Sequence, residues 1–251
     1  MTKKFALMVF GQPRYCEPCI QSIKKNLPLG EFDVYGFFWT YPNAPEIEIN
    51  NEVYIKKQQA IYKRHQEFLA KIQAAIDFYA LEAAPQIDFP PKFKNGSHED
   101  RVTLDTQSDP IKYTRAANRD MQSQWYAQWK CFQMIEQSGL HYDGVLRLRL
   151  DVPLSHPLDI QSLDPSKAWF NIRAEYYFFD HVYYSSQENM KIICDMSLFL
   201  DKVLHGYAYF SITQGEVHLA RYVKSRFPDH KIGYSTFGQG EHRTICNDWY
   251  K

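Results

Sequence analysis

The chain has 251 residues, of which 29 are basic and 29 acidic, so its formal net charge is zero. This length favours a single α/β domain spanning residues 1–251. The balanced charge argues against a nucleic-acid partner, because such proteins carry a basic excess or a clustered basic face.

No apolar stretch approaches the roughly 20 residues that a transmembrane helix needs. The apolar run at residues 5–10 is also too short for the core of a secretory signal. The five cysteines are an odd number spread along the chain, which argues for reduced thiols. We therefore expect a cytoplasmic protein with no transmembrane segment, peripheral to a membrane if it meets one.

The first predicted elements form a strand, a helix and a second strand. Residues 4–10 and 32–41 are continuous apolar runs, a pattern typical of strands that are buried on both faces. Between them, Ile20, Ile23 and Leu27 recur at helical spacing. This order predicts the start of a parallel α/β sheet.

Residues 42–116 are less regular and read as an excursion from the sheet. Residues 53–79 predict one long helix or two shorter ones, and the polar, proline-containing residues 85–114 predict a long loop. Long loops of this kind are often functional lids. A clear amphipathic helix is then predicted over residues 116–138, with Gly139 as its C-cap.

The second half predicts further strands at residues 142–154, 167–173 and 176–186. Helices are predicted at 187–204 and 215–226, and the tail from residue 231 is predicted to be a loop. The fold class expected from this order is α/β, with a mixed, mainly parallel sheet flanked by helices.

The stretch "VLRLRLD" has the most informative pattern. Arg147, Arg149 and Asp151 share one face of a strand, while the leucines between them face the other side. A buried arginine needs a partner because desolvating an unpaired charge costs several kcal/mol. The partner is either an internal carboxylate or an anionic ligand, and we favour the ligand over a solvated edge strand.

The turn "FGQPR" follows the first predicted strand. Gly11 allows close approach of the backbone to a ligand, and Arg14 is suited to pair with a phosphate. The turn lacks the GxGxxG and GK[ST] patterns, so taken alone an ordinary strand-to-helix connection explains it better.

Acidic residues and histidines of the second half are candidates for a general base. Asp180 and His181 follow the aromatic run "YYFF", and Glu216 opens a predicted helix. Glu241 and His242 lie in the tail. Each alone is more often structural, and none forms a known catalytic motif.

The blocks "FALMVFGQPR", "FDVYGFFW", "SQWYAQWKC", "YDGVLRLRLDVPLSHPL" and "YYFFDHVYYSS" together resemble a group of GT-A-like glycosyltransferases. Members of that group occur in bacterial surface-polysaccharide clusters and in large DNA viruses. The resemblance covers most of the chain except about residues 42–112, and its most specific block is 142–151.

The resemblance implies a nucleotide-sugar-binding half at residues 1–155 and an acceptor-binding half at 156–251. It implies transfer of a sugar from a nucleotide-diphosphate donor to a glycan hydroxyl, with Asp180 as the first candidate base and Glu216 and His181 in reserve. The residues implied to bind the donor are Gly11, Gln12, Arg14, Trp39, Asn118, Arg119, Arg147, Arg149 and Asp151. Asn118 and Arg119 are expected at a helix start, where N–H groups favour anions.

The sequence departs from the metal-binding Asp-x-Asp motif of such enzymes. Arg149 stands at the position of the first acid, and Asp151 at that of the second. Either Arg149 neutralises the diphosphate, or Asp151 with phosphate and water holds Mg²⁺ or Mn²⁺. Two alternatives stay open: a non-catalytic nucleotide-sugar or glycan-binding module, and a nucleotidyl- or phosphotransferase.

Overall fold

The computed structural model describes residues 3–11, 17–39, 70, 86–88, 110–149, 152–174, 177–199, 215–235 and 237. The strands in these ranges form a seven-stranded sheet of order β3-β2-β1-β4-β6-β5-β7. Their bounds are β1 (Phe5–Gly11), β2 (Phe32–Trp39), β3 (Gln86–Asp88), β4 (Gly144–Leu148), β5 (Ala168–Ala174), β6 (Tyr177–Ser185) and β7 (Ile232–Tyr234).

The sheet is mixed and mainly parallel, as predicted. β1 pairs in parallel with β2 and β4, β2 with β3, and β5 with β7, whereas β6 is antiparallel to both β4 and β5. β1, β2 and β4 therefore end, and β6 begins, at one edge of the sheet, which we call the carboxyl edge. The strand order reverses between β1 and β4, and open α/β sheets bind ligands beyond the strand ends at such a reversal.

Strand β1 is buried on both faces, as its continuous apolar sequence predicts. Alternate side chains enter two separate cores. Phe5, Leu7 and Val9 face the core that also holds residues of α1 (Glu17–Asn26), which we call the α1-side core. Ala6, Met8 and Phe10 face the other core, which we call the α4-side core. It lies beneath α4 (Pro110–Gln137), α5 (Gln187–Cys194) and α7 (Gly215–Arg226).

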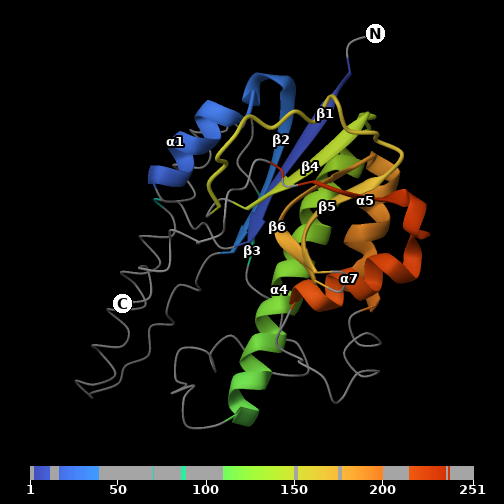
Figure 1. The fold of residues 1–251 in the computed structure, drawn as a ribbon. Coiled ribbons are helices and arrows are strands. Elements are labelled where there is room, and N and C mark those ends of the chain that lie inside the picture. The colour runs from blue at the N-terminus through green and yellow to red at the C-terminus, as the bar shows by residue number, and fades with distance from the viewer. Residues whose placement is uncertain are drawn as a thin grey trace.

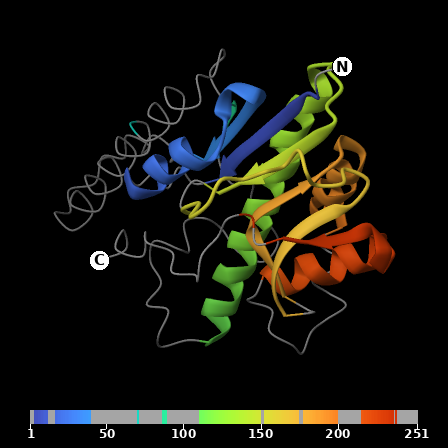
Figure 2. The same ribbon diagram turned by 45° about the horizontal axis from the view of Figure 1, so that its top comes forward.

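The two faces of the sheet thus carry different helices. Figure 1 shows the long helix α4 (green) running behind the strands, and Figure 2 shows α1 (blue) on the opposite side. A 3-10 turn η2 (Asp195–Phe199) extends α5, and two further 3-10 turns, η1 (Leu29–Glu31) and η3 (Asp229–Lys231), precede β2 and β7. None of the helices in the described ranges is long and apolar enough to cross a membrane.

Several helix boundaries follow the sequence. The predicted helix at 215–226 is observed with those bounds. Gly139 follows α4 with a φ of 67°, the left-handed conformation that suits a helix C-cap glycine. At the start of α5, Ser186 accepts a hydrogen bond from the Asn189 N–H at 3.2 Å, so the first turn is capped.

Other predictions about the elements were wrong. Helix α4 begins at Pro110, six residues before the predicted start at Ala116, because proline is well tolerated in the first helical turn. β3 lies inside the predicted loop 85–114 and β7 inside the predicted tail, and three residues are too few to show an alternating pattern. The helix predicted at 187–204 changes to 3-10 geometry after Cys194. The helix predicted at 53–79 falls, apart from residue 70, outside the described residues.

Candidate functional site

Strand β4 carries a buried arginine. Leu146 and Leu148 lie in the α1-side core, and Arg147 points to the opposite face with only 1% of its surface exposed. Its guanidinium carbon lies 5.0 Å from the Phe10 ring centre and 5.2 Å from the Tyr183 ring centre. Cation–π contacts of this kind are strongest where water is excluded, so the two rings help to offset the desolvation of Arg147.

Arg149 lies just past the end of β4 and is partly exposed. Its Nη1 donates to Asp180 Oδ1 at 3.2 Å, and the two side chains are 21% and 11% exposed. Its backbone N–H also donates to the His181 carbonyl at 2.9 Å, which extends the β4–β6 ladder. An internal carboxylate is therefore one partner of Arg149.

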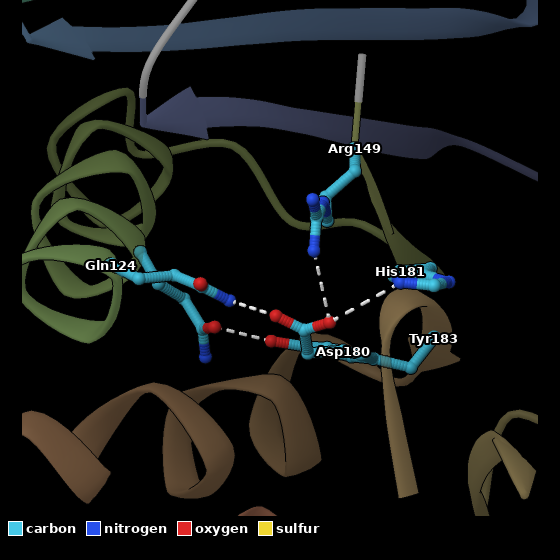
Figure 3. Close-up of polar contacts among 6 residues, drawn as sticks. Gln124, Arg149, Asp180, His181 and Tyr183 are labelled. Atoms are coloured by element: carbon cyan, nitrogen blue, oxygen red, sulfur yellow. Dashed lines mark hydrogen bonds and ion pairs between the residues drawn. The ribbon is translucent and has the colours of Figure 1, made fainter. Parts of the chain in front are cut away.

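The Asp180 carboxylate is held from several sides. Figure 3 shows Gln124 of α4, Arg149 and His181 around it. Gln124 Nε2 donates to Oδ2, and His181 Nε2 lies 3.7 Å from Oδ1. Burial by itself raises the pKa of Asp180, but Arg149, Arg147, His181 and the Gln124 hydrogen bond together hold that pKa below its usual range. Asp180 is therefore ionised at neutral pH.

A local irregularity of β6 aims Asp180 at α4. Phe178 and Tyr183 both lie in the α4-side core, although an odd spacing of five residues puts them on opposite faces of a regular strand. The β5–β6 register shifts between Phe170 and Ile172, at a bulge or similar irregularity. Bulges redirect side chains and are frequent beside active sites.

Glu216 lies in the first turn of α7 and is half-buried. Burial and then repulsion from Asp180 raise its pKa. A hydrogen bond from its own backbone N–H, a hydrogen bond from the Tyr177 hydroxyl and the charge of Arg149 oppose that rise, in decreasing order. Asp180 and Glu216 thus interact with each other and have their pKa values shifted in opposite directions. Pairs separated in this way are typical of acid–base sites.

The three candidate catalytic residues predicted from the sequence therefore come together. Asp180 and His181 are adjacent on β6, and Glu216 of α7 interacts electrostatically with Asp180. Two further members were not predicted, namely Gln124 and Tyr177. Gln128, one turn after Gln124, accepts a hydrogen bond from Tyr183. This pair of glutamines at i and i+4 beside buried Trp125 is the sequence signal for a polar strip on α4 that faces β6.

The predicted donor residues are only partly covered by the structure. Gly11 ends β1, where it pairs with Phe38, and Trp39 ends β2, so both backbones reach the carboxyl edge. The side chain of Trp39 lies outside the described residues, as do Gln12, Arg14 and Asp151.

The expectation for Asn118 and Arg119 was wrong in one respect. Because α4 begins at Pro110, these residues lie beyond its first two turns rather than at its start. Their N–H groups are therefore past the four that a helix leaves unpaired, and cannot serve as a helix N-terminal anion site. Their side chains lie outside the described residues.

A divalent metal is not accounted for by the part of the chain that the structure describes. No three of its His, Cys, Asp and Glu side chains form a group that could hold a metal ion. The carboxylate of Asp180, which lies beside the end of β4, is paired with Arg149. The expected ligand Asp151 is not among the described residues.

Comparison with known proteins gives no assignment. The sequence matches no protein-family model, and no curated protein is significantly similar to it.

Proposed function

We propose that the protein is a GT-A-like glycosyltransferase, which moves a sugar from a nucleotide-diphosphate donor to a glycan hydroxyl. The observation that carries the proposal is the convergence of Arg149, Asp180, His181 and Glu216 at the carboxyl edge of the sheet. This edge is where α/β sheets bind their ligands, beside the reversal of strand order between β1 and β4.

The donor would lie across the ends of β1, β2 and β4. Gly11 and Trp39 end two of these strands, and the partly exposed guanidinium of Arg149 is a cation beside the third. A positive charge there would favour the diphosphate, which gains negative charge as it leaves. The mixed, mainly parallel sheet is consistent with the resemblance to GT-A enzymes. No step is assigned to a metal ion.

One observation favours the alternative of a non-catalytic binding module. Arg149 replaces an acid of the expected metal motif, and its side chain is engaged by Asp180. An arginine held in this way is able to recognise a nucleotide sugar without supporting its cleavage. The two functions differ in whether the bound donor is turned over.

A thermal-shift screen tests nucleotide binding. UDP, GDP, CMP and dTDP are each added with Mn²⁺ or with EDTA to wild type, Asp151→Ala and Asp229→Ala. Ligands that bind the native state raise its melting temperature. We expect a shift with one nucleotide that is lost in Asp151→Ala. Asp229 is the control, because it is exposed and lies in η3 before β7, at the opposite edge of the sheet.

The outcomes separate the candidate functions. A shift in melting temperature that persists in EDTA indicates that protein side chains, rather than a metal ion, neutralise the charge of the diphosphate. Cleavage of the sugar–phosphate bond of the matching nucleotide sugar supports glycosyl transfer, whereas cleavage between phosphates indicates a nucleotidyl- or phosphotransferase. Binding without turnover indicates the binding module, and the absence of any shift contradicts a nucleotide site.

A further inference from the structure

We propose that Glu216 accepts the proton of the attacking hydroxyl, that Tyr177 positions Glu216, and that Asp180 remains a fixed negative charge beside them. This inference rests on the proposed glycosyl transfer. It reverses the order of the two carboxylates expected from the sequence, in which Asp180 was the first candidate base.

Asp180 is poorly placed to exchange a proton. Its Oδ1 accepts from Arg149 at 3.2 Å and lies 3.7 Å from His181 Nε2, and its Oδ2 accepts from Gln124. These donors and the nearby positive charge stabilise the ionised carboxylate and so oppose protonation of either oxygen. The buried guanidinium of Arg147 adds a further positive charge that favours the ionised form. Asp180 therefore keeps its negative charge while the donor and acceptor react.

Glu216 has the opposite setting. It is half-buried in the first turn of α7, so a proton that it takes up is able to leave to solvent. Its carboxylate accepts a hydrogen bond from the Tyr177 hydroxyl, which fixes the orientation of the acid. The charged and titratable groups that act on it are Asp180 and Tyr177 of β6, and Arg149 just past the end of β4.

The neighbouring charge makes Glu216 the better base. Burial and the negative charge of Asp180 raise the pKa of Glu216 above its ordinary value. A general base is most effective when its pKa lies near the working pH, because it is then both ionised and basic enough to accept a proton. The depressed pKa of Asp180 gives it little affinity for one.

The proposed step is a single displacement. The acceptor oxygen forms a bond to the anomeric carbon of the donor sugar while the bond from that carbon to the diphosphate oxygen breaks. The electron pair of the broken bond leaves on the nucleoside diphosphate. The hydroxyl proton passes to Glu216, which releases it to water. Attack opposite the diphosphate inverts the anomeric configuration.

The carboxylate pair is tested first without any substrate. Carbon-13 NMR of protein labelled at the glutamate carboxyl carbons follows the resonance that disappears in Glu216→Gln. We expect it to titrate above the ordinary range of glutamate. Asp180→Asn lowers this pKa by removing the repulsion, and Tyr177→Phe raises it by removing a donor. Glu188→Gln, an exposed position in α5, is the control. A Glu216 resonance that moves in neither variant overturns the proposed pair.

The proton-transfer role is tested by kinetics. UDP-glucose, UDP-galactose, GDP-mannose and dTDP-glucose serve as donors with water as the acceptor, and the released nucleoside diphosphate is measured. Glu216→Gln is expected to lower kcat by roughly 10²- to 10⁴-fold. The acidic limb of kcat/KM moves to lower pH in Asp180→Asn and to higher pH in Tyr177→Phe. A purely structural role would lower stability and leave the limb where it is.

The results distinguish the inference from the function on which it rests. Unchanged turnover and an unchanged pH profile in Glu216→Gln overturn the role of Glu216 while glycosyl transfer stands. A released sugar of retained configuration does the same. The absence of turnover with every donor overturns the function and the role together. Tyr177→Phe removes only a hydroxyl, so it keeps the test decisive if Asp180→Asn does not fold.

Discussion

Arg149 Nη1 and Asp180 Oδ1 lie 3.2 Å apart, although 31 residues separate them in the sequence. The contact joins the end of β4 to β6, the antiparallel strand beside it. It also sits next to the buried Arg147, so two cations and one carboxylate share a largely dry part of the α4-side face. Removing the carboxylate therefore leaves positive charge without its counterion.

The first prediction concerns this charge balance. Asp180→Asn should lower the free energy of unfolding by roughly 3 kcal/mol, because breaking a buried ion pair leaves a desolvated charge uncompensated. Urea denaturation at pH 7 measures the loss. Adding Arg149→Met to this variant should recover part of it, and the double-mutant cycle isolates the interaction between the two side chains.

An exposed ion pair in the same protein provides the comparison. Lys191 Nζ pairs with Glu136 Oε1, but the two side chains are about half and two-fifths exposed. Glu136→Gln should cost well under 1 kcal/mol, as solvated pairs do. Equal losses for Asp180→Asn and Glu136→Gln would contradict the special role given to burial.

The second prediction is the acid dependence of stability. Because the pKa of Asp180 is lower in the folded protein than in the unfolded chain, its ion pair contributes fully above the unfolded pKa, near 3.9. That contribution is lost as the pH falls below this value toward the folded pKa. Urea midpoints measured from pH 5 to pH 2.5 should fall more steeply for wild type than for Asp180→Asn. Parallel curves would contradict the assignment.

A buried histidine gives the third prediction. His218 of α7 is 1% exposed, its ring lies edge-on to Trp125 at 6.3 Å, and neither ring nitrogen has a hydrogen-bond partner among the described residues. His218→Phe should stabilise the protein by about 1 kcal/mol at pH 7.5, because an unsatisfied polar group is removed from the interior. Chemical denaturation of both proteins measures the difference.

The pH dependence of His218 has a definite sign. Burial, with a smaller effect of Arg221, lowers the pKa of His218 in the folded state. As the pH falls below the unfolded value near 6.5, the unfolded chain takes up a proton that the folded protein does not. The advantage of His218→Phe should therefore grow between pH 7 and pH 5. The control is His230→Gln, at an exposed position in η3. A constant difference in unfolding free energy between His218→Phe and wild type across this range would show that another group causes the loss of stability at acid pH.

Much of the fold was predictable because the central strands are buried on both faces. β1 and β2 read as continuous apolar runs, and α7 was predicted with its observed bounds. The alternation of Arg147 with Leu146 and Leu148 also holds in the structure. Strands β3 and β7 could not be predicted, because each is three residues long and depends on pairing with a neighbour.

The candidate site was predictable in its residues but not in their contacts. The periodicity of a strand assumes strict alternation, whereas the register shift in β6 places Phe178 and Tyr183 in the same core. The side toward which Asp180 points therefore depends on an irregularity that residue spacing does not reveal. The sequence does not single out Gln124 for a similar reason, because its partner lies on a strand 56 positions later.

The last prediction tests how closely strand β4 packs against Tyr184, because β4 sets the position of Arg149. A Cβ atom added at Gly144 would lie 2.2 Å from the Tyr184 hydroxyl oxygen and 2.4 Å from its ring. Tyr184 is buried, so its ring has little room to move. Gly144→Ala should therefore lower the free energy of unfolding by roughly 1–3 kcal/mol, the usual cost of overpacking.

Gly30→Ala is the matched control for Gly144→Ala, because no atom lies within 4 Å of its added Cβ. We expect it to be near neutral, since the same methyl group meets open space. If β4 shifts in Gly144→Ala, the Arg149–Asp180 contact should weaken as well, and Asp180→Asn should then cost less in that background than in wild type. An additive double variant would show that β4 keeps its place and that the ring of Tyr184 yields instead.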